Sequence, residues 1–356
     1  MAYKYTHFIP QQIAPKGAKS IAVYDDNGKK VCTIPLGGLT PPTDGMLYSF
    51  GLVSDVHLHQ TTPTWQADKK LDSALSYFEE HGCVFCAHCG DLVNEGFYIN
   101  TNGSTQFNTG QWDMFASVRD KHNIPIYGVC GNHESYGKAI TNNLTELKAY
   151  TGNDLYFTKM QGNDVFIFIG QPYNVVPMSD EALQWLYETL EANRNKRCFI
   201  FVHPDISSGN PLGKYETNRL FDGWGAKTTA FKNLLKHYQN TIIFHGHSHF
   251  MFECQELDET ANYTEKDGFK SVHVPSLSRP TDILDADGMR SENGTRKNVD
   301  TKSYGYLVDV YDDCIVLNGI DFISNSPVPL GTFKIDTTLQ TIEANTFTDS
   351  TGTITV

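Results

Sequence analysis

The stretch Thr241-Ile-Ile-Phe-His-Gly-His-Ser-His-Phe250 decides the interpretation of this chain, because an apolar run ends there in three histidines. Thr241 to Phe244 predict a short buried strand, since β-branched and aromatic residues favour enclosed, pleated positions. Gly246 permits a tight turn, and His247 and His249 are two residues apart, so both imidazoles can face one point. Imidazole nitrogen is a common ligand of transition metals. Taken alone, the stretch fits a metal site about as well as it fits ordinary histidines at a strand end.

Four upstream runs end in the same way, each a mostly apolar stretch that stops at a carboxylate, an amide or an imidazole. They are Leu47 to Ser54 before Asp55 and His57, Cys83 to Gly90 before Asp91, Ile124 to Gly131 before Asn132, His133 and Glu134, and Cys198 to Val202 before His203. In α/β sheets, ligands gather at the carboxyl ends of the strands. Five such endings are hard to explain by packing alone, so the sequence predicts a metal site.

The composition limits the classes of protein and of partner. A chain of 356 residues with 40% hydrophobic content is long enough for one large α/β domain with additions, or for two domains. Its 28 basic and 41 acidic residues give a net charge of −13, so nucleic acid is an unlikely partner. A small anionic substrate remains compatible with this charge, because bound dications would dominate the local field. The oligomeric state is left open.

Neither a targeting segment nor a membrane span is recognisable. Residues 1 to 15 contain no apolar stretch that resembles a signal peptide, and no run approaches the length needed to cross a bilayer. We therefore expect a cytoplasmic protein without a membrane partner.

Cys83, Cys86 and Cys89 are spaced C-x-x-C-x-x-C, which is compatible with a metal cluster or with buried, reduced thiols. The second interpretation is favoured, because cysteine often serves as a small buried hydrophobe and reduced thiols are the default without a secretion signal. If residues 83 to 90 form one strand, Cys83 and Cys89 lie on one face and Cys86 on the other.

The chain divides into three parts. Residues 1–45 predict a small β segment with a hairpin turn at Asp25-Asp-Asn-Gly28 and a linker, residues 46–320 the site-bearing domain, and residues 321–356 a Thr-rich β extension. Strands alternate with helical patterns in the middle part, which favours a largely parallel α/β sheet. Residues 96–110 and 282–302 are expected to be irregular and polar. Residues 205–225 suit either a substrate-selecting lid or a plain surface loop.

The ordered set Asp55-x-His57, Gly90-Asp91, Gly131-Asn132-His133-Glu134, His203 and Gly246-His247-x-His249 resembles the calcineurin-like metallophosphoesterase superfamily. The resemblance covers about residues 47 to 250. It implies a four-layer α/β/β/α sandwich, here with N- and C-terminal β extensions, and two metal ions. By this resemblance Asp55, His57 and His249 hold one metal, Asn132, His203 and His247 hold the other, and Asp91 bridges them. Mn, Fe and Zn all suit these ligands.

The resemblance also implies a reaction. A hydroxide shared by two metals would attack a phosphorus atom in line, and the metals would neutralise the charge that develops. His133 matches the family's histidine that assists the leaving group, while Glu134 is expected to support its loop rather than bind metal. His59 and His88 are interpreted as packing or supporting residues near the site.

Two departures from the family's phosphoprotein phosphatases bear on the substrate. Those enzymes carry Gly-Asp-x-x-Asp-Arg-Gly, where this chain has Gly90-Asp-Leu-Val-Asn-Glu-Gly96. Asn94 can still hydrogen-bond an imidazole, but Glu95 puts an anion where a phosphate-binding cation is expected. A small phosphomonoester or phosphodiester is therefore the expected substrate, with Arg279 as a weak candidate for a replacement phosphate contact. The alternatives are an accessory module of this fold in a structural, cell-surface or phage-type binding protein, and a nuclease.

Overall fold

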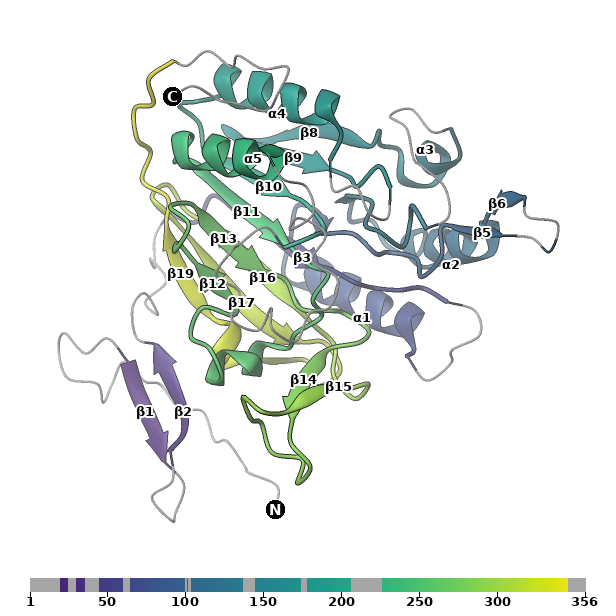
Figure 1. Ribbon diagram of the computed structural model, residues 1–356, viewed down its shortest axis with the longest axis vertical. Coiled ribbons are helices and arrows are strands. Elements are labelled where there is room, and N and C mark those ends of the chain that lie inside the picture. The colour runs from purple at the N-terminus through teal and green to yellow at the C-terminus, as the bar shows by residue number, and fades with distance from the viewer. Residues whose placement is uncertain are drawn as a thin grey trace.

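The computed structural model describes residues 20–24, 30–35, 45–59, 65–99, 101, 104–136, 145–173, 178–205 and 226–344. Two stacked sheets form the centre of the molecule (Figure 1). One sheet has the order β18 (Ser326–Pro327), β17 (Cys314–Asp321), β16 (Tyr304–Val310), β3 (Tyr48–Val53), β4 (Cys86–His88) and β7 (Ile126–Gly128), with β19 (Phe333–Asp336) also paired to β17. The other has the order β12 (Tyr263–Thr264), β13 (Lys270–His273), β11 (Thr241–His245), β10 (Cys198–Phe201), β9 (Asp164–Ile169) and β8 (Tyr156–Gln161).

Helices cover the outer faces of the sheets. Their bounds are Ala67–Glu80 for α1, Thr109–Arg119 for α2, Thr145–Thr151 for α3, Asp180–Ala192 for α4 and Ala226–His237 for α5, and the 3-10 helices η4 and η5 span Phe252–Glu256 and Pro329–Gly331. Ser179 begins α4, because its hydroxyl accepts a hydrogen bond from the Ala182 amide at 3.1 Å, as the sequence predicts. None of the described helices combines the length and the apolar composition needed to cross a membrane.

Alternating side chains build three apolar layers, and these fix the four-layer architecture. Phe199 and Phe201 of β10 point between the two sheets, where the Phe50 ring of β3 lies 5.8 and 6.4 Å from theirs. Ile200 of the same strand points the other way, into the cluster formed with α4 and α5. Val53 of β3 likewise faces α1 and α2. The predicted α/β/β/α sandwich is therefore confirmed, with aromatic rings filling its middle.

The sheets are mixed rather than largely parallel, which corrects the sequence-based expectation. β3, β4 and β7 are parallel neighbours, and so are β9, β10, β11 and β13. Pairing becomes antiparallel toward the edges, at β8, β12, β16 and β17. The βαβ pattern predicts the parallel centre correctly. The late strands are joined by short turns, and short connections produce antiparallel pairs.

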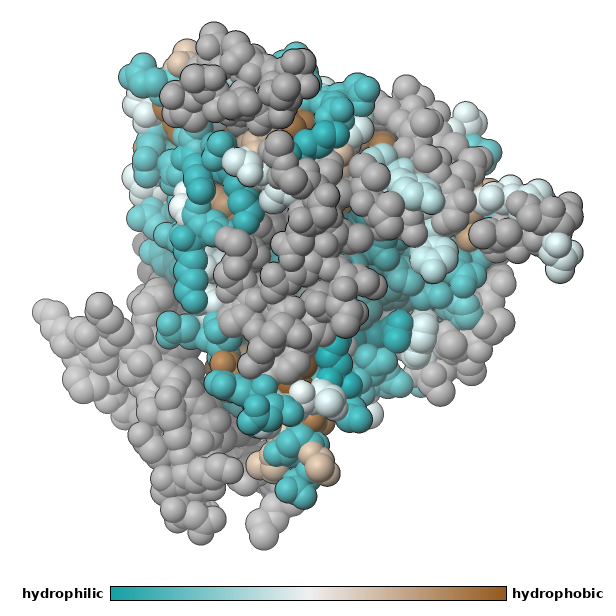
Figure 2. Space-filling view, in the orientation of Figure 1, coloured by the Kyte–Doolittle hydropathy of each residue, from teal (hydrophilic) through white to brown (hydrophobic). Residues whose placement is uncertain are grey.

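Two segments expected to be irregular form β-hairpins. β5 (Phe97–Ile99) pairs with β6 (Thr105–Phe107) inside residues 96–110, and β14 (Thr281–Leu284) pairs with β15 (Thr295–Asn298) inside residues 282–302. All four side chains of β15 are exposed, so this strand carries no apolar alternation that the sequence could reveal. In Figure 2 the described residues of the visible face are mostly hydrophilic, with only small hydrophobic patches.

The cysteine prediction is half correct. The seven described cysteines are free thiols, and Cys86 and Cys89 face opposite sides of the sheet, as expected. Cys83, however, contacts the same cluster as Cys86, because the strand begins only at residue 86 and Cys83 lies in the turn after α1. The expectation of a single strand over residues 83 to 90 is therefore wrong.

The terminal segments are partly described. β1 (Ser20–Tyr24) and β2 (Lys30–Pro35) form the predicted antiparallel hairpin. β18 and β19 pair with β17, so the described strands beyond residue 320 extend the first sheet. The division at residues 45 and 320 stays a prediction, and the expected loop over residues 206–225 and the strand over 351–356 lie outside the described residues.

Candidate metal centre

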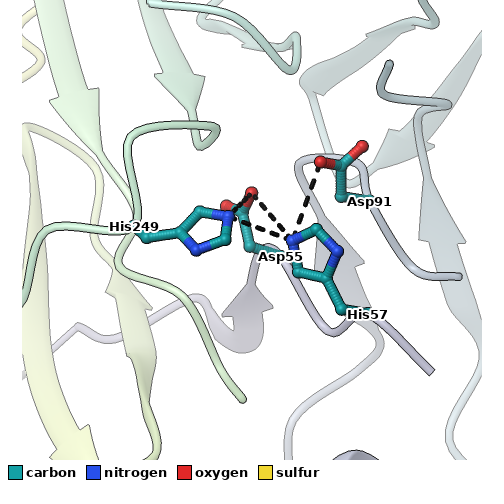
Figure 3. A group of neighbouring side chains, drawn as sticks. All are labelled: Asp55, His57, Asp91 and His249. Carbon is teal, nitrogen blue, oxygen red and sulfur yellow. Dashed lines mark hydrogen bonds and ion pairs between the residues drawn. The ribbon is translucent and has the colours of Figure 1, made fainter. Parts of the chain in front are cut away.

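The polar residues that follow five strands meet at one end of the two stacked sheets. β3, β4 and β7 are parallel neighbours in one sheet, and β10 and β11 are parallel neighbours in the other, so their carboxyl ends point the same way within each sheet. Figure 3 shows Asp55, His57, Asp91 and His249 turned toward one another, Asp55 and His57 from the segment after β3, Asp91 from that after β4 and His249 from that after β11. All seven residues predicted as ligands take part in two groups that share Asp91.

The first group contains Asp55, His57, Asp91 and His249, whose potential ligand atoms lie within 4.8 Å of one another. His249 Nε2 is 3.1 Å from Asp55 Oδ1 and 3.0 Å from His57 Nε2. His57 Nε2 is also 3.8 Å from Asp91 Oδ2. Asp55 and Asp91 are buried, and His57 is 1% exposed, so these polar atoms face one another instead of water.

The second group contains Asp91, His203 and His247, joined by the Asn132 amide. His203 Nε2 is 3.1 Å from Asp91 Oδ2, 2.9 Å from Asn132 Oδ1 and 3.2 Å from His247 Nδ1. Asn132 Oδ1 is 3.1 Å from His247 Nδ1. Asp91 is thus the one carboxylate common to both groups, which is the position that the sequence analysis gave it.

Hydrogen bonds to backbone carbonyls select which imidazole nitrogens face the site. His203 Nδ1 donates to the Cys89 carbonyl at 2.7 Å, so Nε2 is the nitrogen that is directed at the group. His57 and His249 direct Nε2 inward, whereas His247 directs Nδ1 inward. Buried His57 Nδ1 has no hydrogen-bond partner among the described residues. The inward nitrogens are therefore fixed by the fold.

The backbone at the ligands is unusual. Asp55, His57, Asp91, His247 and His249 all have positive φ, between 49° and 71°. Left-handed backbone is uncommon for residues other than glycine and costs of order 1–3 kcal/mol at each position. Only two other described residues that are not glycine share it, Gln66 and Asn325. The strain is concentrated where side chains must turn sharply from a strand end into the site.

The charges of the groups are strongly coupled. Burial alone would raise the pKa of Asp55 and Asp91, but neighbouring imidazoles lower both, chiefly His249 for Asp55 and His203 for Asp91. Burial would lower the pKa of His203, yet Asp91 raises it to about 10. Burial, followed by His133 and His249, lowers the pKa of His57. The two carboxylates and the His203 imidazole therefore favour each other's charged forms.

The donor set fits a pair of transition-metal ions. Imidazole nitrogens, carboxylate oxygens and one neutral amide oxygen are ligands that Mn, Fe and Zn accept. Two facing pairs of imidazole nitrogens at 3.0 and 3.2 Å have no apolar packing reason, and a shared cation would satisfy their lone pairs. The burial of Asp55, Asp91 and His203 points the same way, because buried charges are usually paired or bind metals.

His133 lies beside the two groups and not within them. Its Nε2 is 3.9 Å from Asp91 Oδ2, and its side chain is 28% exposed, so one edge of the ring faces solvent. Its Nδ1 donates to the main-chain carbonyl of Asn94 at 2.5 Å. The expected contact with the Asn94 side chain is thus replaced by a main-chain contact. Because every residue has such a carbonyl, the residue type at position 94 does not decide the orientation of this imidazole.

Glu134 supports the loops that carry the ligands, as the sequence analysis expected. Its carboxylate accepts hydrogen bonds from the amides of Asp91 at 3.0 Å, Val93 at 2.9 Å and Gly131 at 2.6 Å. Burial, and then the charge of Asp91, raises the pKa of Glu134 to about 7, although the amide donors oppose that shift. One carboxylate therefore joins the loops after β4 and β7.

The remaining predicted residues lie around the groups. His88 is buried and accepts a hydrogen bond from the Gly90 amide at 3.3 Å, and the His59 ring lies 5.9 Å from that of Trp65. Both are outside the two groups, in agreement with a supporting role. The Arg279 guanidinium contacts the Trp65 ring, and no ion pair or hydrogen bond joins it to a candidate ligand.

Sequence reasoning named Arg279 but missed that its segment, from Ser276 to Thr281, ties two ligand loops together. The Ser276 hydroxyl donates to the Asp55 carbonyl at 2.8 Å, the Leu277 amide to the Ser54 carbonyl at 2.8 Å and the Thr281 amide to the His249 carbonyl at 2.8 Å. These bonds use backbone atoms and a hydroxyl, for which the sequence carries no distinctive signal.

The chain is similar in fold to several solved structures. A dimetal phosphatase from Danio rerio aligns with a TM-score of 0.56 and 14% identity over 82% of this chain and 100% of that chain. GAP50, the anchor in the inner membrane complex of Plasmodium, aligns with a TM-score of 0.53 and 12% identity over 85% and 91%. The purple acid phosphatase PPD1 from yellow lupin aligns with a TM-score of 0.51 and 12% identity over 87% and 58%. At such identities the likeness establishes the fold alone.

A search of curated proteins found no significant match. The family model for calcineurin-like phosphoesterases matches residues 48–251, which is more than half of the chain and includes β3 through His249. The matched range contains all seven residues of the two groups as well as His133. The chain therefore belongs to the calcineurin-like phosphoesterase family.

Proposed function

We propose that this chain is a dinuclear metal-dependent phosphoesterase that hydrolyses a small phosphomonoester or phosphodiester. One observation carries the proposal: seven side chains of metal-binding type, drawn from five strand ends, form two groups that share Asp91. Family membership supports the same activity. Buried charged groups are usually paired or bind metal ions, and here they are gathered from five separate loops.

Each ligand has a place in this proposal. Asp55, His57 and His249 would hold one ion, Asn132, His203 and His247 the other, and Asp91 both, with Mn, Fe or Zn as suitable metals. When bound, a pair of such ions supplies a nucleophilic water of lowered pKa and neutralises charge on the phosphoryl oxygens. The left-handed backbone at five of these residues helps hold their side chains in one orientation.

His133 is proposed to hold and deliver a proton. Its Nδ1 is occupied by the Asn94 carbonyl, so Nε2 is the atom that can act on a substrate. Its partial exposure leaves that edge accessible, and Nε2 lies 3.9 Å from Asp91 Oδ2, next to the two groups. A proton given to the leaving oxygen by a positioned acid contributes about 10²–10⁴-fold in rate.

The substrate is proposed to be small. Glu95 is exposed and occupies the position where phosphoprotein phosphatases of this family carry an arginine, so a phosphoprotein is disfavoured. The net charge of −13 disfavours a nucleic-acid backbone. Arg279 remains the candidate substrate-binding residue, since it lies beside the first group.

The test is hydrolysis of aryl phosphate monoesters and diesters with added Mn²⁺, Fe²⁺ or Zn²⁺. We expect turnover by the wild-type protein, a loss of at least about 10²-fold in kcat for His133→Asn with its metal content unchanged, and a larger loss for Asp91→Asn with reduced metal content. His237→Gln, at the exposed end of α5, is the control and should keep full activity.

The alternative of a structural or binding module would give a different result. The fold is shared with GAP50, an anchor protein by its description, so the fold by itself does not require catalysis. A protein that binds two ions yet hydrolyses no member of the ester panel would favour the module and contradict the proposed enzyme.

A further inference from the structure

The segment that carries Arg279 is built onto the first metal group. The Leu277 amide and the Ser276 hydroxyl are bonded to the carbonyls of Ser54 and Asp55, and the Thr281 amide is bonded to the carbonyl of His249. The Arg279 amide itself donates to the Ser276 hydroxyl at 2.9 Å. The Arg279 backbone is thus held between the two loops that supply Asp55 and His249.

A buried lysine also holds this segment by hydrogen bonds. Lys70 of α1 is 5% exposed, and its Nζ donates to the carbonyl of Ser278 at 2.7 Å and to that of Asp300 at 2.8 Å. Position 279 is therefore held through its neighbours Ser276, Ser278 and Thr281. A surface loop that positions no functional residue would not need hydrogen bonds from the buried amine of Lys70.

The Arg279 guanidinium lies over an aromatic ring at the edge of the site. Its Cζ is 4.1 Å from the centroid of the Trp65 ring, and that ring is 6.5 Å from the ring of His57, nearly perpendicular to it. Stacking on tryptophan holds a guanidinium by cation–π attraction and leaves its N–H edges directed outward in one plane. The three side chains therefore follow one another at the edge of the site in the order His57, Trp65 and Arg279.

No carboxylate of the described residues directly contacts the Arg279 guanidinium. The guanidinium makes neither a hydrogen bond nor an ion pair with these residues, and its buried Nε lacks an acceptor. Burial, and to a lesser extent the charge of Arg296, lowers the pKa of Arg279, while the charges of Asp300 and Asp55 oppose that shift without contacting the guanidinium. By contrast, a carboxylate contacts each of Arg119, Arg194, Arg197 and Arg290. The Arg279 guanidinium thus keeps N–H donors available for an anionic partner, in a chain that is strongly acidic.

We propose that Arg279, held by Trp65, binds a second acidic group of the substrate, a carboxylate or phosphate separate from the phosphoester that is cleaved. This inference rests on the proposed phosphoesterase function and deepens it. The guanidinium contacts Trp65 and not the ligands, so the bound acidic group lies beside the metal centre. A planar fork of N–H donors suits two-point contact with a carboxylate or phosphate.

A matched pair of substrates tests the proposal. Carboxyphenyl phosphate and carbamoylphenyl phosphate, each as the 3- and 4-isomer, have the same shape and differ in one charge. We expect the wild-type protein to prefer a carboxylate isomer by about 10- to 100-fold in kcat/KM. Arg279→Gln should reduce this ratio to about one by slowing only the carboxylate substrate. Arg279→Lys and Trp65→Leu should give intermediate ratios, and Arg194→Gln, in the turn after α4, should behave as wild type.

The outcomes separate the two proposals. Equal loss on both substrates in Arg279→Gln would overturn the inference in favour of a contact with the cleaved phosphoryl group. A wild-type protein that hydrolyses both without preference would overturn it outright. If no substrate is hydrolysed, the proposed function fails, while the acidic subsite can still be measured. For that purpose, calorimetric titration with benzene-1,3-dicarboxylate should show binding that Arg279→Gln weakens at least 10-fold, and the corresponding diamide should not bind. Absent or unchanged binding would overturn the subsite.

Discussion

His57 Nε2 lies 3.0 Å from His249 Nε2, although 192 positions separate the two residues in the chain. Both nitrogens also face the buried carboxylate of Asp55. Either one Nε2 carries a proton and donates it to the other, or the two lone pairs share a cation. The second group repeats the relationship, with His203 Nε2 3.2 Å from His247 Nδ1. We infer two metal ions from this repeated geometry more than from any single residue.

Gly131 permits the close approach of the two groups. A Cβ at this position would lie 2.2 Å from Asp91 Oδ1 and 2.8 Å from His203 Cδ2. Gly131→Ala should therefore displace the shared carboxylate and weaken Mn²⁺ binding by about 10- to 100-fold, measured by titration calorimetry. The control is Gly162→Ala in the β8–β9 turn, where φ is +59° and no atom lies within 4 Å. That variant should lose about 1–2 kcal/mol of stability and keep its metal affinity. Equal affinities of both variants and the wild type would contradict the geometry.

The Glu134 carboxylate should contribute measurably to stability. Glu134→Gln replaces one of its acceptor oxygens by an amide donor, so at least one buried N–H of Asp91, Val93 or Gly131 loses its partner. An unsatisfied buried polar group costs about 1–3 kcal/mol, and we expect a decrease of that size in the free energy of unfolding from urea titration. The exposed neighbour serves as the control: Glu95→Gln should stay within about 0.5 kcal/mol of wild type. Similar effects of the two changes would disprove a supporting role for Glu134.

Lys70 should make stability depend on alkaline pH. Burial lowers the pKa of Lys70 from 10.5 to about 8, so below pH 8 both the folded and the unfolded chain hold the proton and the cost of burying the charge is fully present. Between pH 8 and 10.5 the folded chain releases the proton first. The unfolded state then binds more protons, and stability rises with pH.

The comparison is made between the wild type and Lys70→Met, whose other titrating groups are the same. From pH 7.5 to 10.5 the unfolding free energy of the wild type should rise relative to the variant by on the order of 3 kcal/mol. Urea titrations at intervals of half a pH unit measure this difference. A difference that stays constant or falls with pH would show that the Lys70 amine keeps its charge in the folded chain.

The sequence alone was sufficient for the parts of the site that follow apolar strands. Runs such as Thr241 to Phe244 and Cys198 to Phe201 are buried on both faces, so their ends are easy to locate, and the ligands come directly after them. The order of the motifs then predicted the layered fold and the grouping around Asp91. In these positions local pattern and tertiary structure agree.

Other features depend on contacts that local pattern does not encode. The main-chain carbonyl of Asn94 orients His133, and carbonyls have no residue signature. The segment of Ser276 and Thr281 joins two ligand loops through bonds that many Ser and Thr residues could make. The hairpin of β14 and β15 is polar, and its sequence has no pattern that predicts the pairing of its strands. The pairing depends on the position of the hairpin against the site, where the Thr281 amide donates to the His249 carbonyl.

The metal content of the purified chain tests the central claim most directly. Elemental analysis after saturation with Mn, Fe or Zn and removal of free ions should find about two ions per wild-type chain. Asp91→Ala, which lacks the carboxylate common to both groups, should retain one ion or none, while His237→Gln should retain two. A wild-type chain that binds no ion under any of these conditions would contradict the account.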